Sequence, residues 1–284
     1  MAKGRWNRWR DAIVAVTTWT AAILVAVVFV WLLADIVIGG IAKLSWTFLT
    51  EAPRDAGRAG GIAPILVSTA LILAVCMVAS VPLSLATAIL LAEFTPADGI
   101  FGRVVRRSLD VLAGVPSIVF GLFGYAFFCN TLGLGFSILS GGLTLACMVL
   151  PLLIRTTEEG MRSLSDDYRR AAAALGMTRT TTIFKVLLPA ALPSLIVGLI
   201  LSIGRASAET AALIFTSGYV DRMPSSLWDS GRAITVHILD LAINVPGGTE
   251  NAYATALVLV MALLIINSVA SWLGQRWLRR SIVR

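Results

Sequence analysis

The sequence predicts an all-α, polytopic membrane protein with six transmembrane helices. Its composition, its apolar runs and the placement of its charges lead to this fold class. Hydrophobic residues make up 57% of the 284 residues and charged residues only 14%, with a mean hydropathy of +0.86. Soluble domains carry about 25% charged residues, because their surface must face water. The same composition excludes a disordered chain, which has too few apolar residues to bury.

Six apolar runs have the length that a helix needs to cross about 30 Å of hydrocarbon, which is about 20 residues. In chain order they cover residues 12–34, 60–92, 111–132 and 136–154, a segment that begins near residue 186, and residues 251–273. The first run is longer than the core of a signal peptide, and no small-residue cleavage site follows it. We therefore expect it to be a membrane span.

Prolines and glycines inside these runs predict bends and close helix contacts. A proline removes a backbone donor and bends its helix, which membrane helices tolerate when neighbours satisfy the freed carbonyl. Closely spaced glycines allow two helix backbones to approach each other. The positions concerned are Pro82, Pro116, Pro151 and Pro193, and the pairs Gly121/Gly124 and Gly141/Gly142.

The basic residues predict the orientation of the chain in the membrane. They cluster in residues 3–10, between the second and third spans (103–107), between the fourth and fifth (155–185), and in residues 276–284. Basic residues are in excess on the cytoplasmic side, so both termini are expected there. The net charge of +7 is then a topology signal with some attraction to anionic lipid, and it does not favour a nucleic-acid-binding protein.

The predicted organisation is a cytoplasmic tail, residues 1–11, followed by one six-span domain, residues 12–284. Two loops are expected to form structure outside the membrane. One is cytoplasmic, over about 155–188, and the other is external, over about 221–250. In the external loop, residues 226–242 predict a short amphipathic helix that packs on its own spans, contacts an external partner or covers an outer gate. Its apolar face consists of Ile234, Ile238, Leu241 and Ala242.

The sequence offers no chemistry for an enzyme. The three cysteines lie far apart in apolar runs and the chain has a single histidine, so no metal-ligand spacing occurs. The phosphate-binding sequence Gly-x-x-x-x-Gly-Lys-Ser/Thr is also absent from the sequence, so we expect no ATP hydrolysis by this chain. We expect no catalytic residue, no metal site and no cofactor. The three cysteines are Cys76, Cys129 and Cys147, and the single histidine is His237.

The cytoplasmic loop predicts a helix–turn–helix elbow. Ser165 suits the N-cap of a helix, and the two aspartates that follow it favour the positive end of the helix dipole. An alanine run of high helix propensity ends at Gly176, which suits the position after a helix C-terminus. Thr178 can then cap a second helix that runs through Ile183 and Phe184 into the fifth span.

Arg205 and Glu209 are the only charged residues between Val186 and Val220. This run is too long for one straight crossing, so a bend or break is expected near Gly204. Residues four apart share a helix face, where opposite charges can meet. An arginine in the bilayer must face protein or a water-filled path, and its planar fork suits a tetrahedral oxyanion. The pair is therefore either an anion site on a translocation path or a salt bridge that locks helices.

The elbow resembles the cytoplasmic motif of ABC importer permeases, which is written EAA, three residues, Gly, nine residues, Ile-x-Leu-Pro. Ala171-Ala172, Gly176 and Val186-Leu187-Leu188-Pro189 have this spacing, with Arg170 in place of Glu and Val186 in place of Ile. The resemblance implies that the elbow docks in a groove of an ATP-hydrolysing subunit. This coupling role falls on Arg170, Ala171, Ala172, Gly176, Val186 and Pro189.

Residues 204–213, with Gly204-Arg205-Ala206 and Glu209-Thr210-Ala211-Ala212-Leu213, are similar to the phosphate-specific ABC permeases of the PstA/PstC family. Thr235-Val236-His237-Ile238 and Asn251-Ala252-Tyr253-Ala254 resemble the PstA-type subunit more than its PstC-type partner. The similarity extends from about residue 111 to the C-terminus. It implies the type I fold of ABC importer permeases and makes Arg205, Glu209 and Thr210 candidate residues of a phosphate path.

The resemblance also implies partners and a location. These are a second, PstC-type permease, a dimer of ATP-binding subunits that bind Mg-ATP, and an external phosphate-binding protein, at the inner membrane of a bacterium. The expected function is that of a non-catalytic permease subunit that moves phosphate by alternating access. The alternatives are a permease for molybdate or sulfate, a secondary anion transporter that needs no ATP, and a membrane anchor without transport function.

Overall fold

The computed structural model describes the backbone of residues 2–96 and 99–282. Many of the basic residues predicted to mark the two termini lie outside the side chains that are described. Within the described part, five helices are long and apolar enough to cross a membrane, and a bent pair of helices makes a sixth span if it is counted as one. The predicted all-α class is therefore confirmed, and the third span differs from the prediction.

The five continuous spans match the first, second, fourth, fifth and sixth apolar runs, although each differs from its run by several residues at one or both ends. Two of them contain a π-helical turn, named η2 and η4. The spans are α1 (Ala2–Ile41), α3 (Ala63–Ile89) with η2 (Leu90–Phe94), α6 (Ile138–Arg162), α8 (Arg179–Thr182) with η4 (Ile183–Leu187) and α9 (Leu188–Ser207), and α12 (Thr249–Ile282).

The third predicted span, residues 111–132, lies in a bent pair of helices, and the bend falls at Pro116, one of the prolines that predict bends. The chain forms α4 (Ile100–Ala113), then α5 (Ser117–Gly124) with the π-helical η3 (Tyr125–Thr131), at an angle of 98°. Pro116 lies at the break, where it lacks a backbone donor and restricts the residue before it, so α4 cannot continue. The other three prolines named above lie inside α3, α6 and α9, where the helices continue past them.

The predicted close contacts between helices are confirmed at the glycine pairs. A Cβ atom on Gly121 would lie 2.9 Å from the Cα atom of Ala212, and one on Gly141 would lie 2.8 Å from the Cβ atom of Ser217. Such separations leave no room for a side chain. The absence of a side chain at these positions therefore lets α5 and α6 lie directly against the segment that follows α9.

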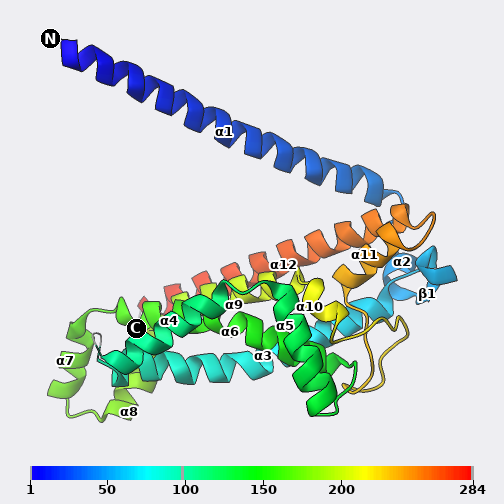
Figure 1. Cartoon of the computed structure of the whole chain (residues 1–284). Coiled ribbons are helices and arrows are strands. Elements are labelled where there is room, and N and C mark those ends of the chain that lie inside the picture. Colours follow the sequence, from blue (N-terminus) through cyan, green and yellow to red (C-terminus); the bar gives the residue numbers. More distant parts are fainter. Residues whose placement is uncertain (1, 97–98, 283–284) are drawn as a thin grey trace.

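The helices form an elongated bundle in which α3 and α6 pack together, α9 and α12 lie beside them, and α1 diverges from the rest (Figure 1). Fully buried Ile72, Leu145 and Leu153 lie in the largest core cluster. α1 meets the bundle near its C-terminal end, where the Tyr253 hydroxyl donates to Asp35 Oδ2 at 2.9 Å. Within the described range Trp9–Ile41, the most apolar stretch of α1 has no buried residue.

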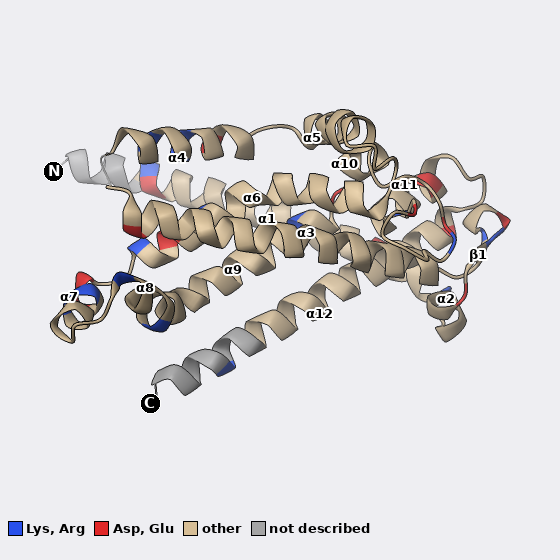
Figure 2. Cartoon of the chain, turned by 90° about the horizontal axis from the view of Figure 1, so that it is seen from below, with Lys and Arg blue, Asp and Glu red and all other residues tan. Residues whose placement is uncertain are grey.

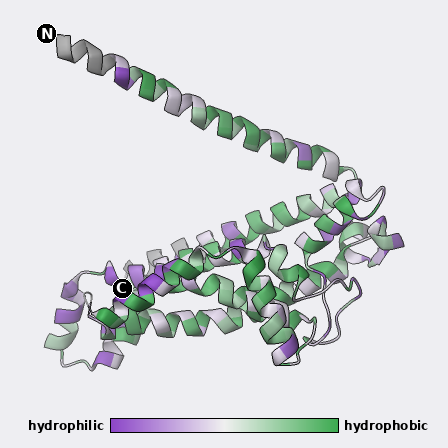
Figure 3. Cartoon of the chain, in the orientation of Figure 1, coloured by the Kyte–Doolittle hydropathy of each residue, from purple (hydrophilic) through white to green (hydrophobic). Residues whose placement is uncertain are grey.

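Charged residues gather at the two ends of the bundle, and the helices between them are mostly apolar (Figures 2 and 3). One end carries α7 (Asp166–Ala174) and α8. The other end carries α2, α10, α11 and a two-stranded antiparallel ribbon in which Pro53 pairs with Gly60. Their bounds are α2 (Trp46–Thr50), β1 (Pro53–Arg54), η1 (Asp55–Gly57), β2 (Ala59–Gly60), α10 (Ala211–Ile214) and α11 (Ile234–Ile243).

The external helix predicted over residues 226–242 begins later than expected, since α11 starts at Ile234. Asp229 Oδ2 accepts hydrogen bonds from the backbone N–H groups of Ser225 and Ser226 at 2.7 and 3.1 Å. Aspartate that binds nearby backbone in this way competes with helix formation, which explains the delayed start. α11 packs on its own spans α12 and α3, with Ile234 and Leu241 buried.

Candidate functional site

The elbow predicted for residues 165–188 forms as the local sequence predicts. Ser165 caps α7 by accepting a hydrogen bond from the N–H of Asp167 at 3.2 Å, and Thr178 caps α8 by accepting one from Thr181 at 3.3 Å. Gly176 lies between the two helices with a φ of +68°. Because this left-handed conformation costs an L-residue about 1–2 kcal/mol, glycine suits the turn.

The predicted coupling residues of α7 are split between its two sides. Arg170 and Ala171 are exposed, and Arg170 pairs with Asp167 of the same helix at 3.1 Å. Ala172 is buried and faces the rest of the molecule. The elbow also exposes three large apolar side chains, Tyr168, Leu175 and Phe184. These apolar side chains lie beside charged groups and are accessible to a partner protein.

The two remaining predicted coupling residues lie where the elbow joins the fifth span. Val186 is half-buried within η4, and Pro189 is exposed in the first turn of α9, directly after this π-helical turn, where it has no N–H to donate to a carbonyl of the preceding turn. Ile183 and Leu187 of η4 are buried against Met161 and Ala191. The helix is continuous from α8 to α9, so the elbow is joined directly to a membrane span.

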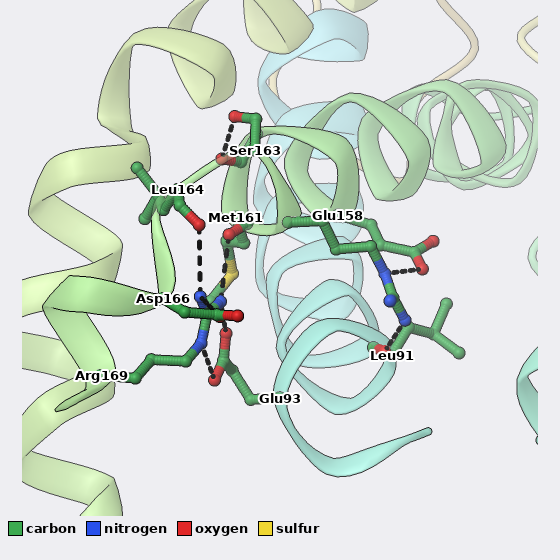
Figure 4. Close-up of polar contacts among 10 residues, drawn as sticks. Leu91, Glu93, Glu158, Met161, Ser163, Leu164, Asp166 and Arg169 are labelled. Atoms are coloured by element: carbon green, nitrogen blue, oxygen red, sulfur yellow. Dashed lines mark hydrogen bonds and ion pairs between the residues drawn. The ribbon is translucent and has the colours of Figure 1, made fainter. Parts of the chain in front are cut away.

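Arg169 anchors the elbow to two other helices (Figure 4). Its guanidinium donates to both carboxylate oxygens of Glu93 in η2, at 2.6 and 3.2 Å. It also donates to the backbone carbonyls of Met161 and Leu164, at the end of α6, at 3.2 and 3.3 Å. The hydrogen bond to Glu93 is the largest of the causes that raise the pKa of Arg169.

A second ionic cluster lies at the same end of the bundle, around Glu158. This carboxylate is 1% exposed, and its Oε1 accepts hydrogen bonds from Arg106 of α4 at 3.0 Å and from Arg162 at 2.9 Å. Arg162 also donates to the carbonyl of Leu91 in η2 at 2.6 Å. A buried carboxylate is stable only when it is paired in this way, so the cluster ties α4, α6 and η2 together.

Arg169, Glu93 and Glu158 are functional candidates that no sequence motif singled out. Arg169 is one of several basic residues of its loop, and neither glutamate belongs to a motif. A signal was present, because Glu93 and Glu158 are acidic residues at the ends of apolar spans on the side rich in arginine. Partners far apart in the sequence could not be assigned from that signal.

The predicted ion pair between Arg205 and Glu209 does not form in the structure. α9 ends at Ser207 and residues 208–210 are not helical, so the two residues no longer share a helix face. Glu209 Oε1 instead accepts from the N–H of Ala212 at 3.2 Å, at the start of α10. The break that was expected near Gly204 therefore falls just after Arg205.

Arg205 is exposed, and none of the ion pairs found among the described residues involves it. On the same helix, the hydroxyls of Ser202 and Ser207 are buried and have no hydrogen-bond partner within the described structure. Thr210 is half-buried at the start of α10. The Thr235 hydroxyl of α11 donates to the Glu209 carbonyl at 2.6 Å, which connects the break after α9 to α11.

The single histidine is buried in α11, and its charge state is set by its surroundings. His237 Nδ1 lies 3.3 Å from Arg232 Nη1, and the same arginine atom pairs with Asp240 at 3.0 Å. Burial, with the positive charge of Arg232, lowers the pKa of His237 to about 4. Among the described residues, no group of three His, Cys, Asp or Glu side chains could hold a metal ion.

Comparisons with known proteins give likenesses over most of the chain. The family described as binding-protein-dependent transport system inner membrane component matches residues 81–283. The probable ABC transporter permease protein YqgI of Bacillus subtilis is 34% identical over 270 residues, which are 89% of this chain and 91% of that protein. The phosphate transport system permease protein PstA of Mycobacterium leprae is 31% identical over 267 residues, 92% of this chain and 87% of that one.

The fold resembles that of solved transporter subunits. A chain of the MetNI methionine ABC transporter in an inward-facing conformation superimposes with a TM-score of 0.55. The superposition covers 76% of this chain and 95% of that chain, at 18% sequence identity. A likeness at this level of identity concerns the fold alone.

Proposed function

The chain belongs to the family of binding-protein-dependent transport system inner membrane components, and we propose that it is the PstA-type permease subunit of an ATP-driven phosphate importer. Relatives named as phosphate permeases match more than nine-tenths of its length, and the solved subunits that share its fold come from ABC transporters. As a multi-pass protein of this family, it functions in the inner membrane of a bacterium.

The observation that carries the proposal is the capped elbow at one end of the bundle. Its two helices are fixed by Ser165, Gly176 and Thr178, and α8 continues through η4 into α9. A rigid unit that exposes Arg170, Ala171 and an apolar surface provides a dock for an ATP-hydrolysing subunit. A carrier driven by an ion gradient alone would have no use for such a dock.

The mechanism assigns the ATP chemistry to partner subunits and the pathway to this chain. The ATP-binding subunits hold Mg-ATP, and their closure displaces the elbow. That displacement shifts the spans between outward-open and inward-open packings, which is a change of population between two states. Arg205 offers the anion a transient partner, because its guanidinium is exposed and takes part in none of the ion pairs of the described residues.

The complex requires further subunits. The exposed apolar surface of α1 supports a second permease of the PstC type, since a long uncovered helix can pack on a neighbouring chain within the bilayer. The external end of the bundle, with α11 and the ribbon, is the surface offered to a phosphate-binding protein. The net charge of +7 allows anionic lipid to bind at the cytoplasmic face.

The test is uptake of labelled phosphate by the reconstituted complex, with and without ATP, and with excess sulfate or molybdate as competitor. We expect uptake that requires ATP and is unaffected by either competitor. Suppression by sulfate or molybdate would assign a different cargo to the same machine. Uptake without ATP would overturn the proposal in favour of a secondary anion transporter.

A further inference from the structure

Within the elbow, α7 has few packing contacts with the bundle. Ala172 is the one fully buried residue among the nine of α7. A cavity of about 300 Å³ lies beside the helix, between α7, η2 and η4. Its lining includes Glu93, Phe94, Arg169, Ala173, Ile183 and Leu187. A movement of α7 is therefore transmitted to η2 mainly through specific polar bonds.

Arg169 supplies those bonds. It holds both oxygens of Glu93, and two parallel hydrogen bonds of this kind are stronger and more directional than a single one (Figure 4). Its side chain is 28% exposed and that of Glu93 is 11% exposed, so water screens the pair only partly. The carbonyls of Met161 and Leu164 hold the same guanidinium from the other side.

Glu93 lies in a segment that is suited to transmit movement. The π-helical turn η2 ends the helix that begins with α3. π-helical segments occur mostly as single turns within α-helices, and such turns are frequent at functional sites. The last carbonyls of a helix have no partner within it, and Arg162 of α6 satisfies that of Leu91. The end of α3 is thus held by one arginine from α6 and one from the elbow.

We propose that Arg169 is a positioning residue that links the elbow to the cytoplasmic end of α3 through Glu93. A displacement of the elbow then moves η2 directly, in addition to moving α9 through η4. The inference rests on the proposed function, since it requires ATPase subunits that displace the elbow. Two spans joined to one elbow would respond together, which an all-or-none switch between two packings requires.

The neighbouring Arg170 lacks the contacts for this role. Its side chain is 76% exposed and its ion pair is with Asp167 of the same helix, so the pair connects nothing to the spans. Arg170 is placed to face an ATPase subunit, and Arg169 is placed to face the bundle. The two adjacent arginines therefore have separate functions.

The test measures phosphate transported per ATP hydrolysed in the reconstituted complex, for Glu93→Gln, Arg169→Gln and the double variant. We expect ATP hydrolysis to persist and the transport ratio to fall about fivefold or more in each, within the usual range of coupling between sites. The double variant should lose no more than either single variant. The matched control is Asp110→Asn, which removes a 2.6 Å pair between α4 and α6 that does not involve the elbow, and its ratio should stay unchanged.

Two further results separate the possible failures. If Glu93→Gln prevents assembly, Glu93→Asp is used in its place, because it retains the charge but shortens the side chain. A reduced ratio of phosphate transported to ATP hydrolysed in that variant would support the inference. An unchanged ratio in the assembled variants would overturn it, as would failure of both glutamate variants to assemble, because the pair would then serve folding. ATP-independent uptake by the unmodified complex would instead contradict the proposed function itself.

Discussion

Arg205 shows how the position of a helix end changes the role of a single residue. Had α9 continued, Arg205 and Glu209 would have been paired on one face, and the guanidinium would have been neutralised. The helix ends at Ser207 instead, and Glu209 binds the backbone of Ala212. Arg205 therefore keeps an exposed guanidinium that can bind an anion.

We predict that Arg205→Gln lowers phosphate uptake by about 10- to 100-fold, which corresponds to the loss of a hydrogen bond to a charged group. Arg205→Lys should retain part of the activity, because lysine keeps the charge but loses the planar fork. Uptake of labelled phosphate measures both, with the amount of assembled complex as the control. A fully assembled Arg205→Gln complex with normal uptake would remove Arg205 from the path.

The buried His237 should make the free energy of unfolding depend on pH. Its pKa is about 4 in the folded protein and about 6.5 ordinarily, because burial and Arg232 oppose the charged form while Asp240 and Asp221 favour it. Between these values the unfolded chain binds the proton and the folded chain does not. Stability should therefore fall as pH drops from about 6.5 towards 4, by at most about 1.4 kcal/mol per pH unit from this group.

The measurement is thermal unfolding of the purified protein between pH 8 and pH 4.5, compared with His237→Gln. The variant should show a flatter dependence over that range, since glutamine takes up no proton. Identical pH profiles for the two proteins would show that His237 is not the titrating group.

At the scale of the element, the elbow depends on the turn between α7 and α8. Gly176 has a φ of +68°, and an added Cβ atom would meet nothing within 4 Å. A substitution there acts through backbone strain alone. Gly176→Ala should destabilise the elbow by about 1–2 kcal/mol and reduce ATP-coupled uptake, while Gly176→Asn should be milder because asparagine tolerates this conformation.

ATPase activity and phosphate uptake of the two Gly176 variants check this prediction. If alanine and asparagine had equal effects, the cause would be a contact between Gly176 and the ATPase subunit. The left-handed conformation of the turn would then not explain the loss.

The ion pairs of Glu158 should stabilise the packing of α4 against α6. Glu158→Ala should lower the free energy of unfolding by about 1.5–3 kcal/mol, because it removes two hydrogen bonds between charged groups and leaves partly exposed arginines behind. Asp110→Asn breaks a more exposed pair in the same helices and should cost about 1 kcal/mol or less. Thermal unfolding in detergent compares them, and equal losses would contradict the special role of Glu158.

At the scale of the whole molecule, charged residues lie at both ends of the bundle, and the expected orientation places the elbow end in the cytoplasm (Figure 2). Leu175 in the elbow is 78% exposed and Trp228 near α11 is 63% exposed, at opposite ends of the bundle. We predict that Leu175→Cys reacts with a membrane-impermeant maleimide only in inside-out vesicles, and Trp228→Cys only in right-side-out vesicles. The native cysteines are buried or half-buried, so the unmodified chain is a suitable background. The reverse pattern would invert the topology.

The sequence by itself determined the features that depend on near neighbours. Apolar runs indicated six spans, five of which are continuous helices in the structure, and Ser165, Gly176 and Thr178 indicated the elbow, because hydrophobic length and helix caps act within a few residues. The family resemblance came from motifs with fixed local spacing. The same local logic placed Arg205 and Glu209 on one helix, which was wrong because the helix ends between them.

The tertiary structure decided everything that joins distant parts of the chain. Arg169 and Glu93 are 76 residues apart in sequence, and Arg106 and Glu158 are 52 apart. The 98° angle between α4 and α5 likewise depends on how the two helices pack beyond the break at Pro116. A charge in the sequence shows only that a partner or solvent is needed, and the packing of the helices determines which partner lies within reach.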